Sequence, residues 1–356
     1  MVADTPSFSV YASIHEIKEL WKDLFARNKS FSFYQSYEWN ECLEKKRKRV
    51  FGAEGKLAYW VYDKCVIFPL VIDDKQSIIR LLGYADASDY LSPVFAGEEE
   101  VLERGVRCLC ERVCGKYRLV FSKVSEKMLF YKVLEKLNAS GFLTCTKQQT
   151  VCMCIDTQTH TPTFYDSLSK SARNTYRTAC NRIQKQGWPC EVKVSCGCLD
   201  ASTAGRLSKL YKERRQDCDP RAGWYKKTIF WIKKALEKAG LYRIPDPLSR
   251  YSQLCPVFLA QTFINGELAA FCEGVLCNDG QTLCIARVAT KKAYYHYSPG
   301  QILFVRAIDE IKNNVRYFDL TRGDEDYKVK LGAKPHANFL FEISGCNHTG
   351  KEENTL

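Results

Sequence analysis

The sequence predicts a mixed α/β fold made of two similar units that follow one another in the chain. The chain has 356 residues, which exceeds the size of one typical domain. Hydrophobic residues make up 46% of it and aromatic residues 13%, enough to build a packed core. In each half, helical patterns lead into a β-hairpin, another helix and another strand. A tandem of two α/β units is the simplest interpretation, and a chance similarity in the order of elements is the alternative.

The first unit is predicted over residues 1–157. Apolar residues recur every three or four positions from Ile14 to Phe25, as on one face of an amphipathic helix, and Asp63-Lys64 separates two apolar runs as a hairpin turn does. The expected elements are helices over 14–25, 37–45, 101–113 and 126–138 and strands over 57–62, 66–72, 117–121 and 144–157. The polar segment 157–163 then ends the unit.

The second unit is predicted over residues 158–343, followed by a polar tail over 344–356. Asn265-Gly266 between two apolar runs is the strongest short signal for a hairpin, and basic residues recur through the helical stretch from Tyr165 to Lys185. The expected elements are helices over 165–185, 202–215, 226–239 and 298–314 and strands over 257–264, 267–276, 282–289 and 315–320.

Charge and cysteine content indicate which kinds of partner and which cellular compartment to expect. Lys and Arg number 53 against 41 Asp and Glu, and the net charge of +12 favours an anionic partner such as a nucleotide cofactor, an RNA or an anionic lipid head group. The first residues lack the basic region and apolar run of a signal peptide, so the 18 cysteines are expected to be reduced and the compartment cytoplasmic. The apolar run Val66–Ile72 is too short to span a bilayer and contains Pro69, so membrane contact is expected to be peripheral at most.

The cysteines do not predict a metal site. The sequence contains no CxxC motif, and Cys-x-Cys pairs such as Cys152 and Cys154 do not specify a four-ligand zinc cage. Free thiols are therefore the preferred interpretation. The five histidines lie in no recognisable nucleophile motif, so a catalytic Cys-His pair is not expected.

The segment Ser298-Pro299-Gly300 predicts the start of a helix that can bind an anion. Proline in the first turn needs no N–H donor, serine can cap the helix, and Gly300 lets a ligand approach the backbone. The exposed amides would suit a pyrophosphate. An ordinary capped helix is the alternative.

Polar residues gather at the end of the strand predicted over 315–320. Charges at the end of a buried strand cost free energy unless they are paired or used, so this segment is a candidate site. The candidates are Asp319, Arg322, Asp324 and Lys328. A structural network of ion pairs around a tight turn at Gly323 is the alternative.

Two linked motifs resemble a known family. The run YFDLTRGDEDYKVKLG at Tyr317–Gly332, preceded by YYHYSPGQILFVRAIDEI at Tyr294–Ile311, resembles the CelD-like GNAT acyltransferases associated with bacterial cellulose and exopolysaccharide synthesis. The basic segment LSKSARNTYRTACNRIQKQG at Leu168–Gly187 and the aromatic segment FYQSYEWNECLEK at Phe33–Lys45 are similar to the same family. The resemblance implies two tandem GNAT-like domains, an arrangement shared with Fem-type aminoacyltransferases of the peptidoglycan pathway.

The resemblance also implies roles for individual residues. An acyl-CoA donor is expected, and no metal. Direct attack on a thioester needs a group that protonates the leaving thiolate and a group that accepts a proton or orients the acceptor. By the resemblance, the first is Tyr327 and the second is Asp319 or Asp324. The residues expected to bind the donor are Ser298, Gly300, Gln301, Arg322 and Lys328, and those expected to bind the acceptor are Arg173, Arg177 and Tyr294. For Tyr327 the alternative is a half-buried aromatic ring with a solvated hydroxyl.

The predicted function is transfer of an acyl or acetyl group from acyl-CoA to an amine or hydroxyl of a sugar or of a cell-envelope or exopolysaccharide precursor. The acceptor could be a small molecule or a lipid-linked sugar. A GNAT usually holds pyrophosphate with a glycine-richer loop, whereas Pro299 here lacks an N–H, and this departure leaves the donor open. The alternatives are a Fem-like transferase that uses aminoacyl-tRNA and a non-catalytic binder of an anionic polymer or lipid head group. Nucleic acid is a partner only in the case of aminoacyl-tRNA.

Overall fold

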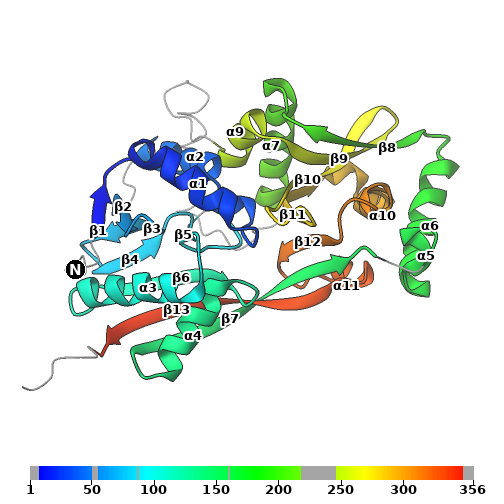
Figure 1. Cartoon of the computed structure of the whole chain (residues 1–356). Coiled ribbons are helices and arrows are strands. Elements are labelled where there is room, and N and C mark those ends of the chain that lie inside the picture. Colours follow the sequence, from blue (N-terminus) through cyan, green and yellow to red (C-terminus); the bar gives the residue numbers. More distant parts are fainter. Residues whose placement is uncertain (1–7, 50–54, 86–87, 159–160, 218–245, 348–356) are drawn as a thin grey trace, which may run out of the picture.

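The computed structural model describes residues 8–49, 55–85, 88–158, 161–217 and 246–347. Within these ranges one mixed sheet runs along the molecule, and helices cover both of its faces (Figure 1). The predicted mixed α/β fold is confirmed by this arrangement.

The first half contains the elements that the hydrophobic pattern indicates, together with short additions. Its capping box begins the first helical segment, because the Ser13 N–H donates to Glu16 Oε1 at 2.8 Å while the Ser13 side chain caps the turn. Asp63 and Lys64 both have positive φ, as a tight hairpin turn requires. The elements are β1 (Phe8–Tyr11), η1 (Ile14–Ile17), α1 (Lys18–Arg27), η2 (Phe33–Gln35), α2 (Tyr37–Arg49), β2 (Lys56–Tyr62), β3 (Val66–Asp73), β4 (Ile78–Leu81), β5 (Val94–Phe95), α3 (Glu99–Val113), β6 (Arg118–Ser125), α4 (Leu129–Ala139) and β7 (Leu143–Asp156).

The second half repeats this order with longer strands. Asn265 and Gly266 take positive φ in the turn of the second hairpin, as their sequence predicts. The elements are α5 (Phe164–Ser167), α6 (Lys170–Lys185), β8 (Cys190–Gly197), α7 (Ala201–Asp217), α9 (Pro247–Leu254), β9 (Val257–Ile264), β10 (Glu267–Leu276), β11 (Thr282–Thr290), η3 (Lys292–Tyr297), α10 (Pro299–Ile311), β12 (Tyr317–Arg322), α11 (Asp326–Lys330) and β13 (Lys334–Cys346).

The two halves exchange strands at the middle of the sheet. The order of strands is β1-β2-β3-β4-β6-β13-β7-β12-β11-β10-β9-β8, and β5 pairs with β3 beside this path. Strand β13, from the end of the chain, therefore lies between β6 and β7 of the first half, and β7 in turn pairs antiparallel with β12 of the second half. Each half thus completes the sheet of the other. The division of the chain into units at residues 157 and 158 stays a prediction.

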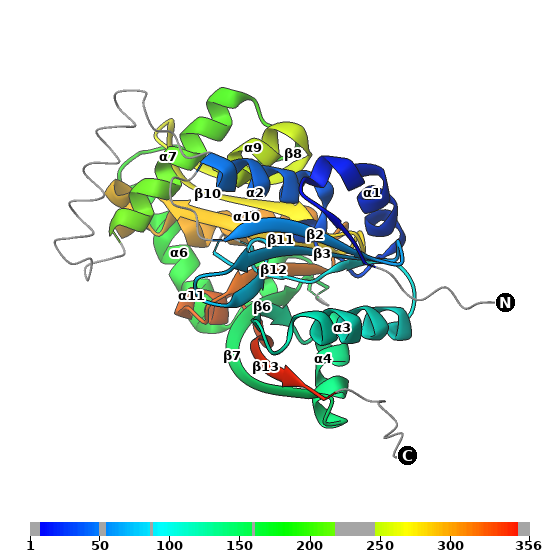
Figure 2. The same cartoon turned by 90° about the vertical axis from the view of Figure 1, so that its left-hand side faces the viewer.

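Helices and aromatic side chains also join the halves. Figure 2 shows α2, α7 and α9 together on one side of the sheet, with α3 and α4 on the other. Tyr251 of α9 packs against Phe33 and Trp39 of the first half, with ring centroids 5.4 and 5.9 Å apart. Such buried aromatic contacts stabilise a fixed placement of one half on the other.

Several elements differ from the predicted ones. The helix predicted over 165–185 is divided, because the Ser169 side chain accepts a hydrogen bond from the Ala172 N–H and caps a new helix there. Strands β4, β8 and β13 and helix α9 were not predicted, although in β8 Cys190, Val192 and Val194 alternate with more exposed residues as in a half-buried strand. Strand β13 runs to Cys346, beyond the point where a polar tail was expected to begin. The helix predicted over 226–239 lies outside the described residues.

Candidate active site

Strands β11 and β12 run side by side and then part. They pair in parallel from Thr282 with Tyr317 to Cys284 with Asp319. Beyond that point β11 continues to Thr290, while the ladder between β12 and β7 shifts register between Asp319 and Arg322. The main-chain groups of the later part of β11 are therefore not paired with β12, and a ligand could use them.

Two residues with left-handed backbone flank this parting. Thr321 has a φ of +56° and Ser298 a φ of +46°, although neither is glycine. For β-branched Thr321 this conformation is strained, and the surroundings must hold it. The Thr321 N–H donates to Asp319 Oδ1 at 2.8 Å, and the Thr321 hydroxyl donates to the Ile285 carbonyl at 3.4 Å. Strain of this kind marks a candidate functional segment.

Lys328 is turned inward and holds the loop after β12. Its side chain is only 2% exposed, and Nζ donates to the carbonyls of Arg322 at 2.6 Å, Gly323 at 3.1 Å and Thr321 at 3.4 Å. Glu325 lies 2.9 Å from the same ammonium. Because all three N–H donors are engaged, Lys328 shapes the loop rather than offering a free charge to a phosphate.

Tyr327, the predicted general acid, lies on the face of the sheet that α10 covers. Its ring stacks on Phe304 of α10, with centroids 5.6 Å apart and planes within 15°. Burial raises the pKa of Tyr327 above its ordinary value, with a smaller contribution from the Glu325 charge. The hydroxyl therefore keeps its proton at neutral pH, which a general acid requires. Phe304 is one helical turn from Gly300, so the structure brings Tyr327 close to the start of α10.

An open cleft of about 660 Å³ lies where α6 meets the start of α10. Its lining is cationic and rich in hydroxyl groups, and it includes no carboxylate. The lining residues are Lys170, Ser171, Asn174, Thr175, Thr178, Arg182 and Ser298. Lys170 and Ser171 begin α6 at one end of the cleft, whereas Arg182 lies about 18 Å further along α6, close to the start of α10. There Arg182 Nη1 donates to the His296 carbonyl at 2.8 Å. The arrangement suits a phosphate group.

The start of α10 offers few free backbone donors. Pro299 has no N–H, the Gln301 N–H donates to the Ser298 carbonyl at 3.0 Å, and the Ser298 N–H donates to Tyr295 at 3.1 Å. Gly300 is partly exposed, and a Cβ placed there would meet Thr290 Oγ1 at 3.5 Å, an ordinary contact. Within the described residues, the buried Gln301 Nε2 has no hydrogen-bond partner. Side chains of α6 must therefore supply much of the binding of an anion here.

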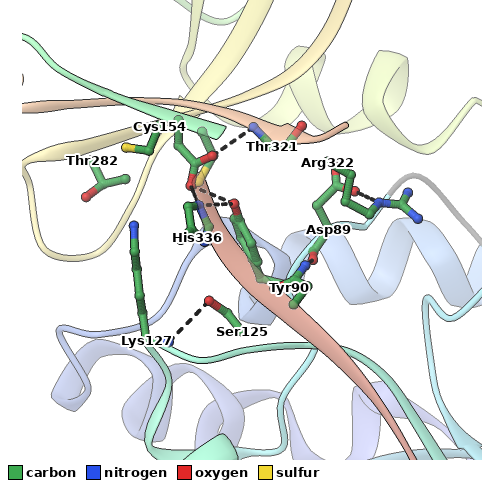
Figure 3. Close-up of polar contacts among 12 residues, drawn as sticks. Asp89, Tyr90, Ser125, Lys127, Cys154, Thr282, Thr321, Arg322 and His336 are labelled. Atoms are coloured by element: carbon green, nitrogen blue, oxygen red, sulfur yellow. Dashed lines mark hydrogen bonds and ion pairs between the residues drawn. The ribbon is translucent and has the colours of Figure 1, made fainter. Parts of the chain in front are cut away.

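A buried hydrogen-bonded cluster joins Asp319 to the first half (Figure 3). The Tyr90 hydroxyl donates to Asp319 Oδ2 at 2.7 Å, and His336 Nε2 lies 3.3 Å from the same hydroxyl and 3.7 Å from the carboxylate. Burial raises the pKa of Tyr90 well above its ordinary value, and the Asp319 charge raises it further. Asp319 is thus an acceptor within a closed cluster, not a free base.

Arg322 also reaches across to the first half, where it pairs with Asp89 (Figure 3). The Asp89 side chain is 8% exposed, and its Oδ2 accepts a hydrogen bond from the Tyr34 hydroxyl at 3.3 Å. The guanidinium remains 43% exposed, so one side of it is open to solvent. The structural network that was the alternative for this segment is therefore present at Arg322, Asp319 and Lys328.

Asp319 and Tyr327 lie on opposite faces of the sheet. Phe318 and Leu320 pack with Phe304 under α10, and side chains alternate along a strand, so Asp319 between them faces the other way. The predicted pairing of Asp319 with Tyr327 in one cleft is not what the structure shows. Asp324 is exposed, and no hydrogen bond or ion pair with another described residue holds it.

The predicted acceptor-binding residues are not among those that line the α6/α10 cleft. Arg173 Nη1 donates to the Asp166 carbonyl at 3.0 Å and Arg177 Nη2 to Asn174 Oδ1 at 2.5 Å. Tyr294 is buried and its hydroxyl donates to Glu267 Oε2 at 2.9 Å. Neither arginine is among the lining residues, but Arg177 borders the cleft because its hydrogen-bond partner Asn174 lines it.

A second buried ionic cluster lies between β10, β11 and α9. Arg287 Nε donates to Glu273 Oε2 at 2.5 Å, and Arg287 Nη1 donates to Asp246 Oδ2 at 2.9 Å. Burial raises the pKa of Glu273, although the Arg287 charge opposes the shift. Next to it, Arg214 of α7 donates to the Val288 carbonyl of β11 at 2.7 Å, in the part of β11 that does not pair with β12. Arg287 thus belongs to β11, and Arg214 contacts the same strand, where β11 has separated from β12.

The sequence missed four of the residues that shape this region. Lys170 and Arg182 share a face of α6 with the hydroxyl residues at 171, 175 and 178, and helical spacing could have shown this. Asp89 and Tyr90 lie far from β12 in the sequence, and no local pattern connects them to it.

Among the described residues, no group of three His, Cys, Asp or Glu side chains could hold a metal ion. Within the same ranges, no helix is long and apolar enough to cross a bilayer.

Residues 170–329 match the family model of an acetyltransferase (GNAT) domain. The matched segment contains α6, the start of α10, β12 and Tyr327, which are the parts that build the cleft and the parting strands. The second half thus contains a segment that matches a GNAT acetyltransferase domain, and the mixed α/β sheet agrees with that match. A comparison with curated protein sequences finds no match.

Solved structures with the same fold extend over nearly the whole chain. The C-terminal domain (DUF2156) of a candidate lysylphosphatidylglycerol synthetase from Agrobacterium fabrum has a TM-score of 0.54 and 15% identity, covering 94% of this chain and 93% of its own. FemX has a TM-score of 0.54 and 10% identity, covering 95% and 97%. A conserved protein of unknown function from Bacteroides thetaiotaomicron VPI-5482 has a TM-score of 0.55 and 11% identity, covering 95% and 99%. At these identities the likeness concerns the fold alone.

Proposed function

We propose that this protein transfers an acyl group from acyl-CoA to an amine or hydroxyl of a sugar or another cell-envelope or exopolysaccharide precursor, in the manner of the CelD-like enzymes. The reaction would take place in the cytoplasm, with peripheral contact to a membrane if the acceptor is lipid-linked. The observation that carries the proposal is the cationic α6/α10 cleft, whose lining includes Ser298 at the start of α10, the helix whose Phe304 stacks on the Tyr327 ring. A phosphate-bearing donor held there would direct its acyl end toward the parting of β11 and β12.

The donor would be held by side chains more than by backbone amides. Lys170, Arg182 and the Ser298 hydroxyl line the cleft, and the N–H of Gly300 lies at the same helix start. Charge-assisted hydrogen bonds to phosphate are stronger than neutral ones, so two cations can replace the missing amides of a glycine-rich loop. Main-chain groups of β11 beyond Cys284 would bind an extended donor arm.

Tyr327 would protonate the leaving group. The acceptor nitrogen or oxygen attacks the thioester carbonyl, a tetrahedral intermediate forms, and the carbon–sulfur bond breaks as the thiolate takes the Tyr327 proton. The Tyr327 hydroxyl is neutral at physiological pH, and because burial raises its pKa it would give up its proton only to a strong base such as the leaving thiolate. Asp324 is the predicted carboxylate that stays exposed near this loop, and it would accept the proton of the acceptor.

A Fem-like transferase that uses aminoacyl-tRNA is the second candidate function. The small number of free amides at the start of α10 favours it, because a pyrophosphate gains less there than at a glycine-rich loop. Helix α6 also carries five cations and no carboxylate, which suits the backbone of an RNA. The names of the two structural relatives, FemX and a lysylphosphatidylglycerol synthetase, would fit an acceptor in the cell wall or a lipid acceptor.

Binding measurements with paired variants separate these candidates. Acetyl-CoA and an aminoacyl-tRNA should be titrated against the wild-type protein and against Lys170→Gln/Arg182→Gln. The control is Arg173→Gln, which removes a charge from the same helix outside the lining of the cleft. Loss of acetyl-CoA binding in the first variant alone supports the proposal. Tight binding of aminoacyl-tRNA with none of acetyl-CoA supports the second candidate, and binding of neither contradicts both.

A further inference from the structure

We propose that Asp89 and Tyr90 of the first half are positioning residues for the reaction at the end of β12. They hold Asp319 and Arg322 in place, and through these they fix the loop that carries Tyr327 and Lys328. The inference rests on the proposed acyl transfer, but it concerns residues that lie outside the segment that matches the GNAT domain model.

The segment around Asp89 and Tyr90 is itself held firmly. The Trp39 Nε1–H donates to Ser88 Oγ at 3.0 Å, and the Gln35 Nε2–H donates to the Tyr90 carbonyl at 2.8 Å. Asn338 of β13 donates to the Asp89 carbonyl at 2.6 Å. Because these partners come from α2, η2 and the exchanged strand, the two side chains are presented to β12 from a rigid support.

A chain of hydrogen bonds runs from this support to Lys328, the residue that follows the candidate acid. The Tyr90 hydroxyl donates to Asp319 Oδ2 at 2.7 Å, and the other oxygen of that carboxylate accepts the Thr321 N–H at 2.8 Å. The Thr321 carbonyl is 3.4 Å from Lys328 Nζ, which also binds the next two carbonyls. Lys328 is the neighbour of Tyr327 on α11. Tyr90 therefore supports the strained backbone of Thr321 and, through it, the place of the Tyr327 ring.

The ion pair of Asp89 with Arg322 supports the same turn from its other side. Asp89 is nearly buried and Arg322 is partly exposed, so the pair is shielded more than a surface salt bridge. The carbonyl of Arg322 accepts a hydrogen bond from Lys328 at 2.6 Å. Both ends of the Arg322 residue are thus held, its side chain by the first half and its carbonyl by Lys328.

This arrangement gives the first half a role in the reaction proposed for the GNAT-like segment. A small change in the position of a catalytic group lowers the rate strongly, and it affects the chemical step more than the binding of a distant phosphate. The α6/α10 cleft includes no residue of the first half. Loss of the support from Tyr90 should therefore lower kcat while the KM for the donor changes little.

Tyr90→Phe tests the inference, and Tyr59→Phe is its matched control. The Tyr59 hydroxyl is also buried and also donates to a carboxylate, Glu44 Oε2 at 2.7 Å, but this bond lies wholly within the first half. We expect Tyr90→Phe to lower kcat about 10-fold or more with less than about a 2-fold change in the KM for the donor. Tyr59→Phe should leave both constants close to those of the wild type. Equal effects of the two variants, or an effect of Tyr90→Phe on KM alone, would overturn the inference.

Hydrogen exchange measures the same coupling without any assay of activity. Amides over 321–331 should exchange at least about 5-fold faster in Tyr90→Phe than in the wild type and be unchanged in Tyr59→Phe. Asp89→Asn should act like Tyr90→Phe, and Asp89→Glu should restore part of the protection because it keeps the charge. Unchanged exchange in Tyr90→Phe sinks the inference even if the enzyme is active. If the wild type transfers no acyl group but the exchange pattern appears, the proposed function fails and the positional coupling stands.

Discussion

Replacing Lys328 with methionine removes an ammonium that three backbone carbonyls share. Nζ lies 2.6 and 3.1 Å from the carbonyls of Arg322 and Gly323 and 3.4 Å from that of Thr321. A hydrogen bond from a charged donor contributes about 1.5–3 kcal/mol, but carbonyls in an exposed loop regain water when the donor is lost. The contact with Glu325 adds little because that carboxylate is 55% exposed. We therefore expect Lys328→Met to lower the free energy of unfolding by about 3 kcal/mol, the effect of one to two such bonds.

Equilibrium unfolding in urea measures this loss, with Lys330→Met as the control. Lys330 is exposed on the same short helix, so its replacement should change the free energy of unfolding by less than about 0.5 kcal/mol. The sequence alone predicts a different role for Lys328, a contact with the donor phosphate. A variant that unfolds at the wild-type urea concentration but binds acetyl-CoA more weakly would show that the phosphate role is right and the structural reasoning wrong.

Three further predictions concern the cleft, the acid and a reactive thiol. Lys170→Gln combined with Arg182→Gln should weaken donor binding at least about tenfold at low salt. The difference in affinity should shrink as the salt concentration rises, because the lost interactions are with phosphate. A difference that does not depend on salt would argue against a phosphate contact. Tyr327→Phe should lower kcat at least about 100-fold without lowering the urea midpoint of unfolding. Since burial raises the pKa of Tyr327, the wild-type kcat should not fall through deprotonation of this group up to about pH 10. Unchanged turnover in the variant would show that Tyr327 is not the acid. Hydrogen bonding by Cys110 lowers the pKa of Cys114, whereas the pKa of Cys110 is raised well above its usual value, so Cys114 should be alkylated by iodoacetamide at a lower pH than a free cysteine. Peptide mass spectrometry that finds Cys114 labelled with the pH profile of a free cysteine would contradict this.

Local chemistry made some parts of this structure predictable. The turns at Asp63-Lys64 and Asn265-Gly266 have the positive φ that their sequences predict, and the start of α10 follows from Pro299. The expected capping by Ser298 is wrong, because its side chain makes no capping hydrogen bond. Both turns and the start of α10 depend only on neighbours in the sequence. The same is true of the alternating and helical apolar patterns, which placed most of the strands and helices.

Long-range pairing was beyond the reach of such patterns. Strand β13 lies between β6 and β7, so Asn338 pairs with Ser125 and Thr150, both far away in the sequence. The bond of Tyr90 with Asp319 spans 229 positions. Which residues meet across such distances depends on the whole fold, and no local propensity records it.

The direction in which side chains point was the other feature that the sequence could not predict. The sequence placed Asp319, Arg322 and Lys328 correctly at a strand end, but it could not show that Asp319 faces away from Tyr327 or that the Lys328 ammonium points inward. On α6 the residue type suggested an anion site, whereas only the fold shows that Lys170 and not Arg177 lines the cleft. The residue types in a segment show which interactions are possible, and the packing of the fold determines which side chains can make them.

A crystal structure with acetyl-CoA bound would test the central claim most directly. The phosphates should lie within hydrogen-bond distance of Lys170, Arg182 and the Gly300 N–H, with the thioester carbonyl near the Tyr327 hydroxyl at the parting of β11 and β12. Phosphates seated away from the α6/α10 cleft, or a thioester distant from Tyr327, would contradict the account.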